Sequence, residues 1–153
     1  MSEYSIWLLP SAEHEPGLAE TIARLSVLMG GARFEAHVTI QGDLSLPREK
    51  LSRHLRQLAA TTPAQRWRVR GVAADDHFFR CLFLQFGAQP AFDELNTSVA
   101  RFTETTGGLP PHPHLSLAYG QAHPDNDKLC QVLATQFEGQ EIVFDRQIGR
   151  AHV

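Results

Sequence analysis

The stretches His37-Val38-Thr39-Ile40 and His114-Leu115-Ser116-Leu117 carry the strongest signal in this sequence. Each reads histidine, apolar residue, hydroxyl residue, apolar residue. Successive side chains on a β-strand alternate between faces, so each copy presents its imidazole and its hydroxyl on one face and its apolar side chains on the other. The sequence therefore predicts two similar polar half-sites on two strands.

The elements around the two motifs repeat in the same order, which indicates an internal duplication. The two histidines lie 77 residues apart (114 − 37), half the chain length, and a Gly-Gly pair precedes each motif strand, at 30–31 and 107–108. If the halves pack about a pseudo-two-fold axis, His37, Thr39, His114 and Ser116 converge in a cleft. The expected strands are 5–9, 34–41, 66–72, 77–86, 113–119 and 140–146, and the expected helices start at Pro16, Pro47, Pro90 and Pro124, with 66–72 and 77–86 forming a hairpin.

Composition bounds the class of protein. The chain has 153 residues, of which 42% are hydrophobic, enough for one domain with a sizeable core. Its net charge of −3 argues against non-specific binding along a long polyanion and is compatible with a small phosphorylated ligand. No apolar run approaches the length of a membrane span, so we expect a cytoplasmic monomer without a membrane partner. Cys81 and Cys130 are expected as buried free thiols.

Two imidazoles that flank a phosphodiester are suited to acid and base catalysis, because imidazole titrates near neutral pH. One ring activates water, and the other protonates the departing oxygen. The Thr39 and Ser116 hydroxyls are placed to donate hydrogen bonds to the non-bridging phosphate oxygens. This scheme requires neither a metal nor another cofactor.

The two motifs, together with Ser-Ile-Trp-Leu-Leu-Pro at 5–10, Phe34, Gly42 and the extension of the second motif to Tyr119, resemble the two-histidine (2H) phosphoesterase superfamily. Within it they most resemble the cyclic nucleotide phosphodiesterases of the plant and yeast type. The resemblance implies an α+β fold of two lobes, in which two antiparallel sheets flank a central cleft and the helices lie outside.

The same resemblance implies hydrolysis of 2′,3′-cyclic nucleotides, or of ADP-ribose 1″,2″-cyclic phosphate, to the monophosphate. It assigns His37 as the acid, His114 as the base, and Thr39 and Ser116 to phosphate binding. Tyr119 matches a position close to the bound phosphate. The chain lacks the extra cysteines of the plant members, so disulfide gating does not transfer.

Other residues admit both a functional and a structural interpretation. Phe78 and Phe79, and less so Trp67, are candidates for stacking on a base, although core packing is the commoner role of such rings. The alternating Arg66, Arg68 and Arg70 suit either a phosphate backbone or a solvated sheet face. A cluster of His112, His114 and His123 lacks a carboxylate or thiolate to complete a zinc site, so no metal is expected.

Two alternative functions stay open. An RNA 2′,3′-cyclic phosphodiesterase of the RNA-ligase-like 2H branch would act on RNA ends. A non-catalytic module would bind a nucleotide phosphate with the same four residues and would not turn over a cyclic nucleotide.

The last six residues, 148–153, show no pattern of strand, helix or cap. Back-translated as ATC GGA AGA GCA CAC GTC, they reproduce the start of a common short-read sequencing adapter. We therefore expect one domain over residues 1–147, with 148–153 an artefact outside the native reading frame and no functional weight on His152.

Overall fold

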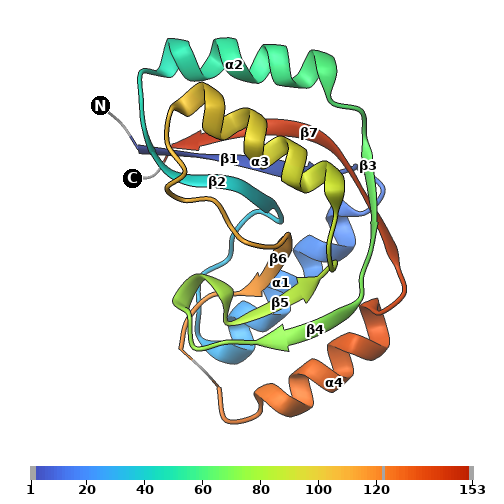
Figure 1. Ribbon diagram of the computed structural model, residues 1–153. Helices are drawn as coiled ribbons and strands as arrows, with labels where there is room; N and C mark the ends of the chain where they lie inside the picture. The colour runs from blue at the N-terminus through green and yellow to red at the C-terminus, as the bar shows by residue number, and fades with distance from the viewer. Residues whose placement is uncertain (1–2, 122, 152–153) are drawn as a thin grey trace.

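A computed structural model describes residues 3–121 and 123–151 (Figure 1). The strands are β1 (Glu3–Pro10), β2 (Val38–Ser45), β3 (Gln65–Arg68), β4 (Gly71–Ala74), β5 (Leu82–Gln85), β6 (His114–Ala118) and β7 (Glu141–Ala151). The helices are α1 (Glu15–Met29), α2 (Arg48–Thr61), α3 (Pro90–Thr103) and α4 (Asn126–Phe137), with a short 3-10 helix, η1, at Phe78–Arg80. The expected order of elements is confirmed, whereas the first motif strand starts at Val38 rather than Phe34.

The strands form one seven-stranded sheet in the order β3-β7-β1-β2-β6-β5-β4, and all of its strand pairs are antiparallel. The α+β class is confirmed, but the expectation of two separate sheets is wrong. The two halves join where the motif strands β2 and β6 pair through Val38 and Leu115. Both side chains are fully buried, so this junction lies on the core.

The expected hairpin of 66–72 with 77–86 is confirmed only in its last part, where Gly71 and Val72 lie opposite Gln85 and Leu84. The first segment divides at Val69 and Arg70: β3 pairs with β7, and β4 pairs with β5. The edge strands β3 and β4 are therefore consecutive in the chain, and the sheet bends so that its two edges approach each other (Figure 1). Two backbone hydrogen bonds fix the chain where it passes from β3 to β4. Val69 N donates to Gln140 O (2.8 Å), and Arg70 N donates to Gln85 O (2.7 Å).

Each half contributes a helix that covers the motif strand of the other half. Helix α1 packs on β6, and α3 packs on β2. The apolar stripes that the sequence predicted are buried in both helices: Leu18, Ile22 and Leu25 in α1, and Phe92, Leu95 and Val99 in α3. This exchange ties the halves into one core. Within the described part of the chain, no helix is long and apolar enough to cross a membrane.

The last strand extends further than expected. β7 runs to Ala151 and pairs with β1 as far as Tyr4, whereas the sequence predicted a strand that ends at Arg146. Backbone pairing needs no particular side-chain pattern, and β1 offers its outer row of amide and carbonyl groups to any extended segment. Residues 152 and 153 lie outside the described residues.

Candidate active site

The register of the two motif strands places the four motif residues in pairs. Val38 is opposite Leu115 in antiparallel strands, so the residues that flank this pair, His37 and Thr39 on one side and His114 and Ser116 on the other, lie around the same junction. All four line one cleft of about 580 Å³. The structure thus brings together the residues that the duplication predicted to converge, and their chemical roles stay predictions.

His37 is held by its backbone and by aromatic rings. Its Nδ1 lies 2.7 Å from the carbonyl oxygen of Glu35 and so donates a hydrogen bond to it. Its ring stacks on Trp7, with centroids 3.6 Å apart and planes at 13°, and meets the edge of Phe34 at 6.4 Å. Only 7% of His37 is exposed. Any proton that His37 exchanges in the cleft therefore passes through Nε2.

His114 repeats this arrangement in the second half. Its Nδ1 lies 3.5 Å from the carbonyl oxygen of His112, again the residue two positions earlier. Burial lowers the pKa of His114 below its usual value, the His112 carbonyl opposes this, and the charges of Arg80 and His77 lower it further. The neutral form of this imidazole is favoured near neutral pH, and neutral imidazole can accept a proton.

The hydroxyl of Ser116 donates a hydrogen bond to the carbonyl oxygen of Phe79, over 2.6 Å. The neighbouring Phe78 carbonyl accepts a hydrogen bond from Gly120 N at 2.9 Å. These two bonds fix the 3-10 turn η1 against the end of β6. Thr39 lies on the opposite motif strand and is half-buried.

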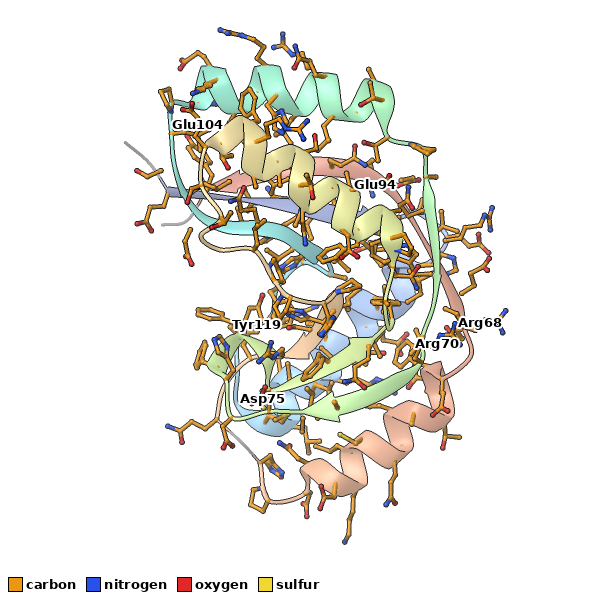
Figure 2. All side chains as sticks on the ribbon, in the orientation of Figure 1. Arg68, Arg70, Asp75, Glu94, Glu104 and Tyr119 are labelled. Carbon is orange, nitrogen blue, oxygen red and sulfur yellow. The ribbon has the colours of Figure 1, made fainter. Side chains whose placement is uncertain are left out.

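Tyr119 and Phe79 form an aromatic part of the cleft. Tyr119, labelled in Figure 2, stacks on Phe34 with centroids 3.7 Å apart, and it meets Phe79 edge to face at 5.3 Å. Burial raises the pKa of Tyr119 to about 12, so its hydroxyl stays protonated. Phe79 lines the cleft and is 59% exposed, whereas Phe78 does not line it. Of the two candidates for base stacking, the structure places Phe79 at the site.

Three cleft residues that were not among the sequence candidates are Trp7, His77 and Arg80. Trp7 had a signal, because alternation on β1 puts it on the face opposite the buried Ile6 and Leu8. No sequence signal indicated His77 and Arg80, because tertiary contacts bring η1 and the residue before it to the cleft. Arg80 donates to Asp75 from Nε (3.2 Å) and Nη2 (2.8 Å).

The segment between α3 and β6 closes one side of the cleft. The buried Gln41 side chain donates to the carbonyl oxygens of Thr105 (3.0 Å) and Gly107 (2.9 Å). Gly108 then approaches β2 so closely that a Cβ atom on it would lie 2.0 Å from the Gly42 carbonyl oxygen, and its φ is +75°. Only glycine fits this position.

The remaining candidates lie elsewhere. Trp67 is 2% exposed and packs on core phenylalanines, which excludes it from base stacking. Arg66 pairs with Glu141 at 3.3 Å on the outer surface. His123 accepts a hydrogen bond from Asp125 N at 3.1 Å. Among residues 3–121 and 123–151, no group of three or more His, Cys, Asp or Glu side chains is placed to hold a metal ion.

Arg150 also lines the cleft, where it pairs with Glu35 and lies 5.6 Å from the Trp7 ring centroid. We assign no function to these contacts, because Arg150 belongs to the segment 148–153 that the sequence sets apart.

Comparisons with known proteins agree with this geometry. Residues 15–146 match the family described as the 2′-5′ RNA ligase superfamily. Among solved structures, the chain is similar to E. coli LigT in apo form (15% identity, TM-score 0.56, covering 99% of this chain and 95% of that one). It is also similar to Usb1 of Kluyveromyces marxianus (12% identity, TM-score 0.54, covering 97% and 93%).

A structure of E. coli LigT complexed with 3′-AMP is similar as well (19% identity, TM-score 0.53, covering 80% of this chain and 75% of that one). At these identities the structural likeness is one of fold. No curated protein sequence matches the chain significantly. The family match spans most of the chain and includes both histidine motifs, so the protein belongs to the 2′-5′ RNA ligase superfamily of 2H phosphoesterases.

Proposed function

We propose that this protein is a metal-independent cyclic phosphodiesterase. It hydrolyses a 2′,3′-cyclic nucleotide, or the related ADP-ribose 1″,2″-cyclic phosphate, to the monophosphate. The observation that carries the proposal is the register at Val38 and Leu115, which gives one cleft two imidazoles and two hydroxyls in pseudo-symmetric positions. In this proposal the phosphate sits in the cleft, over the junction of the two paired motif strands, and contacts all four groups.

The chemistry follows from the surroundings of each histidine. His114, whose pKa is lowered by burial, takes a proton from water as the water oxygen bonds to phosphorus. The bond from phosphorus to the 3′-oxygen breaks, and protonated His37 gives its Nε2 proton to that oxygen. The hydrogen bond from His37 Nδ1 to the Glu35 carbonyl is compatible with the charged ring, in which both nitrogens donate.

The hydroxyls act on the phosphate itself. Thr39 and Ser116 donate to non-bridging oxygens, on which negative charge builds in the transition state. Such donors, held on two paired strands, stabilise the transition state, Ser116 after its hydroxyl has turned from the Phe79 carbonyl to the phosphate. Tyr119, protonated at neutral pH, is a further donor at the edge of the cleft.

The aromatic lining favours a nucleotide over a simple phosphate ester. The exposed face of Phe79, next to Tyr119 and Phe34, offers a stacking surface within the same cleft. The similar LigT structure complexed with 3′-AMP supports a nucleotide ligand in this fold.

RNA with a 2′,3′-cyclic end is the second candidate substrate. The family match favours it, because the matched family is described by its RNA ligase activity. A cyclic mononucleotide and a cyclic RNA end share the reacting group, so the same four residues serve both substrates.

A product assay tests the proposal directly. The purified protein is incubated with 2′,3′-cyclic mononucleotides, ADP-ribose 1″,2″-cyclic phosphate and oligoribonucleotides with cyclic ends. We expect conversion of at least one class to the 2′-phosphate or its equivalent, and loss of that conversion in the His37→Ala, His114→Ala double variant. Binding of these ligands without any turnover would instead make the protein a nucleotide-phosphate binding module.

A further inference from the structure

A second pocket, of about 410 Å³, adjoins the candidate active site. It shares His114 and Arg80 with the cleft and is also lined by Arg70, Phe83, Gln85 and His112. The sheet register explains the adjacency: Phe83 is opposite Ser116 and Gln85 is opposite His114, so the sheet face that carries the second motif continues onto β5. A ligand seated at His114 can therefore extend into this pocket.

The pocket has a positive charge without an acidic counterpart in its lining. Neither Asp nor Glu is among the residues that line it. Arg80 is paired with Asp75, but Arg70 forms no ion pair with any residue of 3–121 or 123–151. The Arg70 stem packs near Gly87, where a Cβ atom would lie 3.5 Å from Arg70 Cγ. Both residues line the pocket.

Arg70 differs in this respect from its neighbours in the alternating arginine run. Arg66 pairs with Glu141, and Arg68 points away from the molecule at its outer edge (Figure 2). Neither lines the second pocket. The break between β3 and β4 separates Arg70 from the other two and places it next to β5, where its backbone N donates a hydrogen bond to Gln85 O.

We propose that this pocket is a second phosphate subsite, which binds a phosphate on the 5-carbon of the ribose that carries the reacting cyclic phosphate. The inference rests on the proposed function for the position of the reacting group. An RNA 3′ end and ADP-ribose 1″,2″-cyclic phosphate both carry a phosphate at this carbon, whereas a simple 2′,3′-cyclic nucleoside phosphate does not. Guanidinium groups suit this ligand because they bind phosphate oxygens through parallel hydrogen bonds.

Binding of two product analogues tests the subsite without any need for turnover. Adenosine 2′-monophosphate and adenosine 2′,5′-bisphosphate differ only by the second phosphate. We expect calorimetry to show tighter binding of the bisphosphate by roughly 3- to 10-fold at low salt, with the difference shrinking as salt is added. Arg70→Gln removes this preference, and the matched control Arg68→Gln retains it. Equal binding of the two analogues by the wild type, or a preference that survives Arg70→Gln, overturns the proposal.

Kinetics then separate the subsite from the proposed function and identify the source of the phosphate. The measured quantity is the ratio of kcat/KM for adenosine 2′,3′-cyclic phosphate with and without a 5′-phosphate. Arg70→Gln is expected to lower this ratio about 3- to 10-fold. A similar loss of kcat/KM is expected on the substrate that supplies the phosphate, which is either a dinucleotide with a cyclic end or ADP-ribose 1″,2″-cyclic phosphate. A binding preference without turnover of any substrate supports the subsite and rejects the phosphodiesterase. Turnover with an unchanged ratio rejects the subsite alone.

Discussion

Ser116 donates its hydroxyl hydrogen bond to the carbonyl oxygen of Phe79, over 2.6 Å, and thereby differs from Thr39, its counterpart in the first motif. Among the described residues, Thr39 makes no side-chain hydrogen bond. A hydroxyl has one proton to donate, so Ser116 must release Phe79 before it can donate to a phosphate. The two motifs are symmetric in position but not in their hydrogen bonds.

This asymmetry predicts different outcomes for removal of the two hydroxyls. Thr39→Val, which preserves shape, is expected to lower kcat by roughly 10- to 1,000-fold with little change in the free energy of unfolding. Ser116→Ala is expected to lower kcat in the same range and also to reduce that free energy by about 1 kcal/mol, because η1 loses a hydrogen bond. Steady-state kinetics and urea unfolding of both variants test this. Wild-type turnover in both would reduce the hydroxyls to ordinary strand residues.

The central part of the site could be predicted from sequence because its signal is local. Alternation along β2 and β6 sets which side chains share a face, and the repeated order of elements indicates that the two strands meet. Their direct pairing at Val38 and Leu115 was not predictable in this way. The sequence pattern is the same whether two strands hydrogen-bond to each other or face each other across a gap.

The errors fall where non-local contacts decide the structure. Residues 66–72 alternate like one strand, yet the chain leaves β7 for β5 at Val69 and Arg70, and only the position of those partners determines where it divides. Arg80 reaches the cleft for a similar reason, since η1 is held there by Ser116. These placements depend on tertiary structure rather than on local pattern.

The pH dependence of turnover follows from the surroundings of His114. As the base, this ring must be neutral, and burial lowers its pKa below the usual value. We therefore expect the acid limb of the kcat/KM profile to lie below pH 6.5. In Arg80→Gln the loss of a nearby positive charge raises the pKa of His114, so the limb moves to higher pH. An acid limb above 6.5 in the wild type would contradict the assignment of the base.

Chelation is expected to leave the activity intact. The described residues provide no metal-binding cluster, and two imidazoles suffice for the proton transfers. Hydrolysis is measured after dialysis against EDTA and again after addition of zinc or manganese. Loss of activity with EDTA, followed by recovery with either metal, would reject the acid–base scheme.

His54 is predicted to make the fold less stable in acid. It is 5% exposed, stacks on Phe102 with centroids 3.8 Å apart, and its buried Nε2 has no hydrogen-bond partner among the described residues. Burial lowers the pKa of His54, so the unfolded chain binds its proton more readily than the folded one. The free energy of unfolding should fall as pH drops below about 6.5, towards the lower pKa of the folded state.

The variant His54→Phe keeps the ring and removes the titration. Urea unfolding at pH 7.5 and pH 5.5 should therefore show a smaller acid loss in His54→Phe than in the wild type. The loss is reduced rather than abolished, because the pKa of His114 is also lowered by burial. His112→Gln, at an exposed position, is the control and should keep the wild-type dependence. An unchanged loss in His54→Phe would show that His54 does not titrate as described.

The division of labour between the two histidines gives the sharpest test of the mechanism. If His37 protonates the leaving 3′-oxygen and His114 activates water, a substrate with a good leaving group needs little help from the acid. On a nitrophenyl ester of the nucleotide, His37→Ala should therefore lose much less activity than His114→Ala, whereas both variants lose most of their activity on the cyclic substrate. The reverse pattern on the ester would exchange the two roles. Full activity of both variants on the cyclic substrate would show that neither ring takes part in catalysis, whatever the geometry that the pairing of Val38 with Leu115 creates.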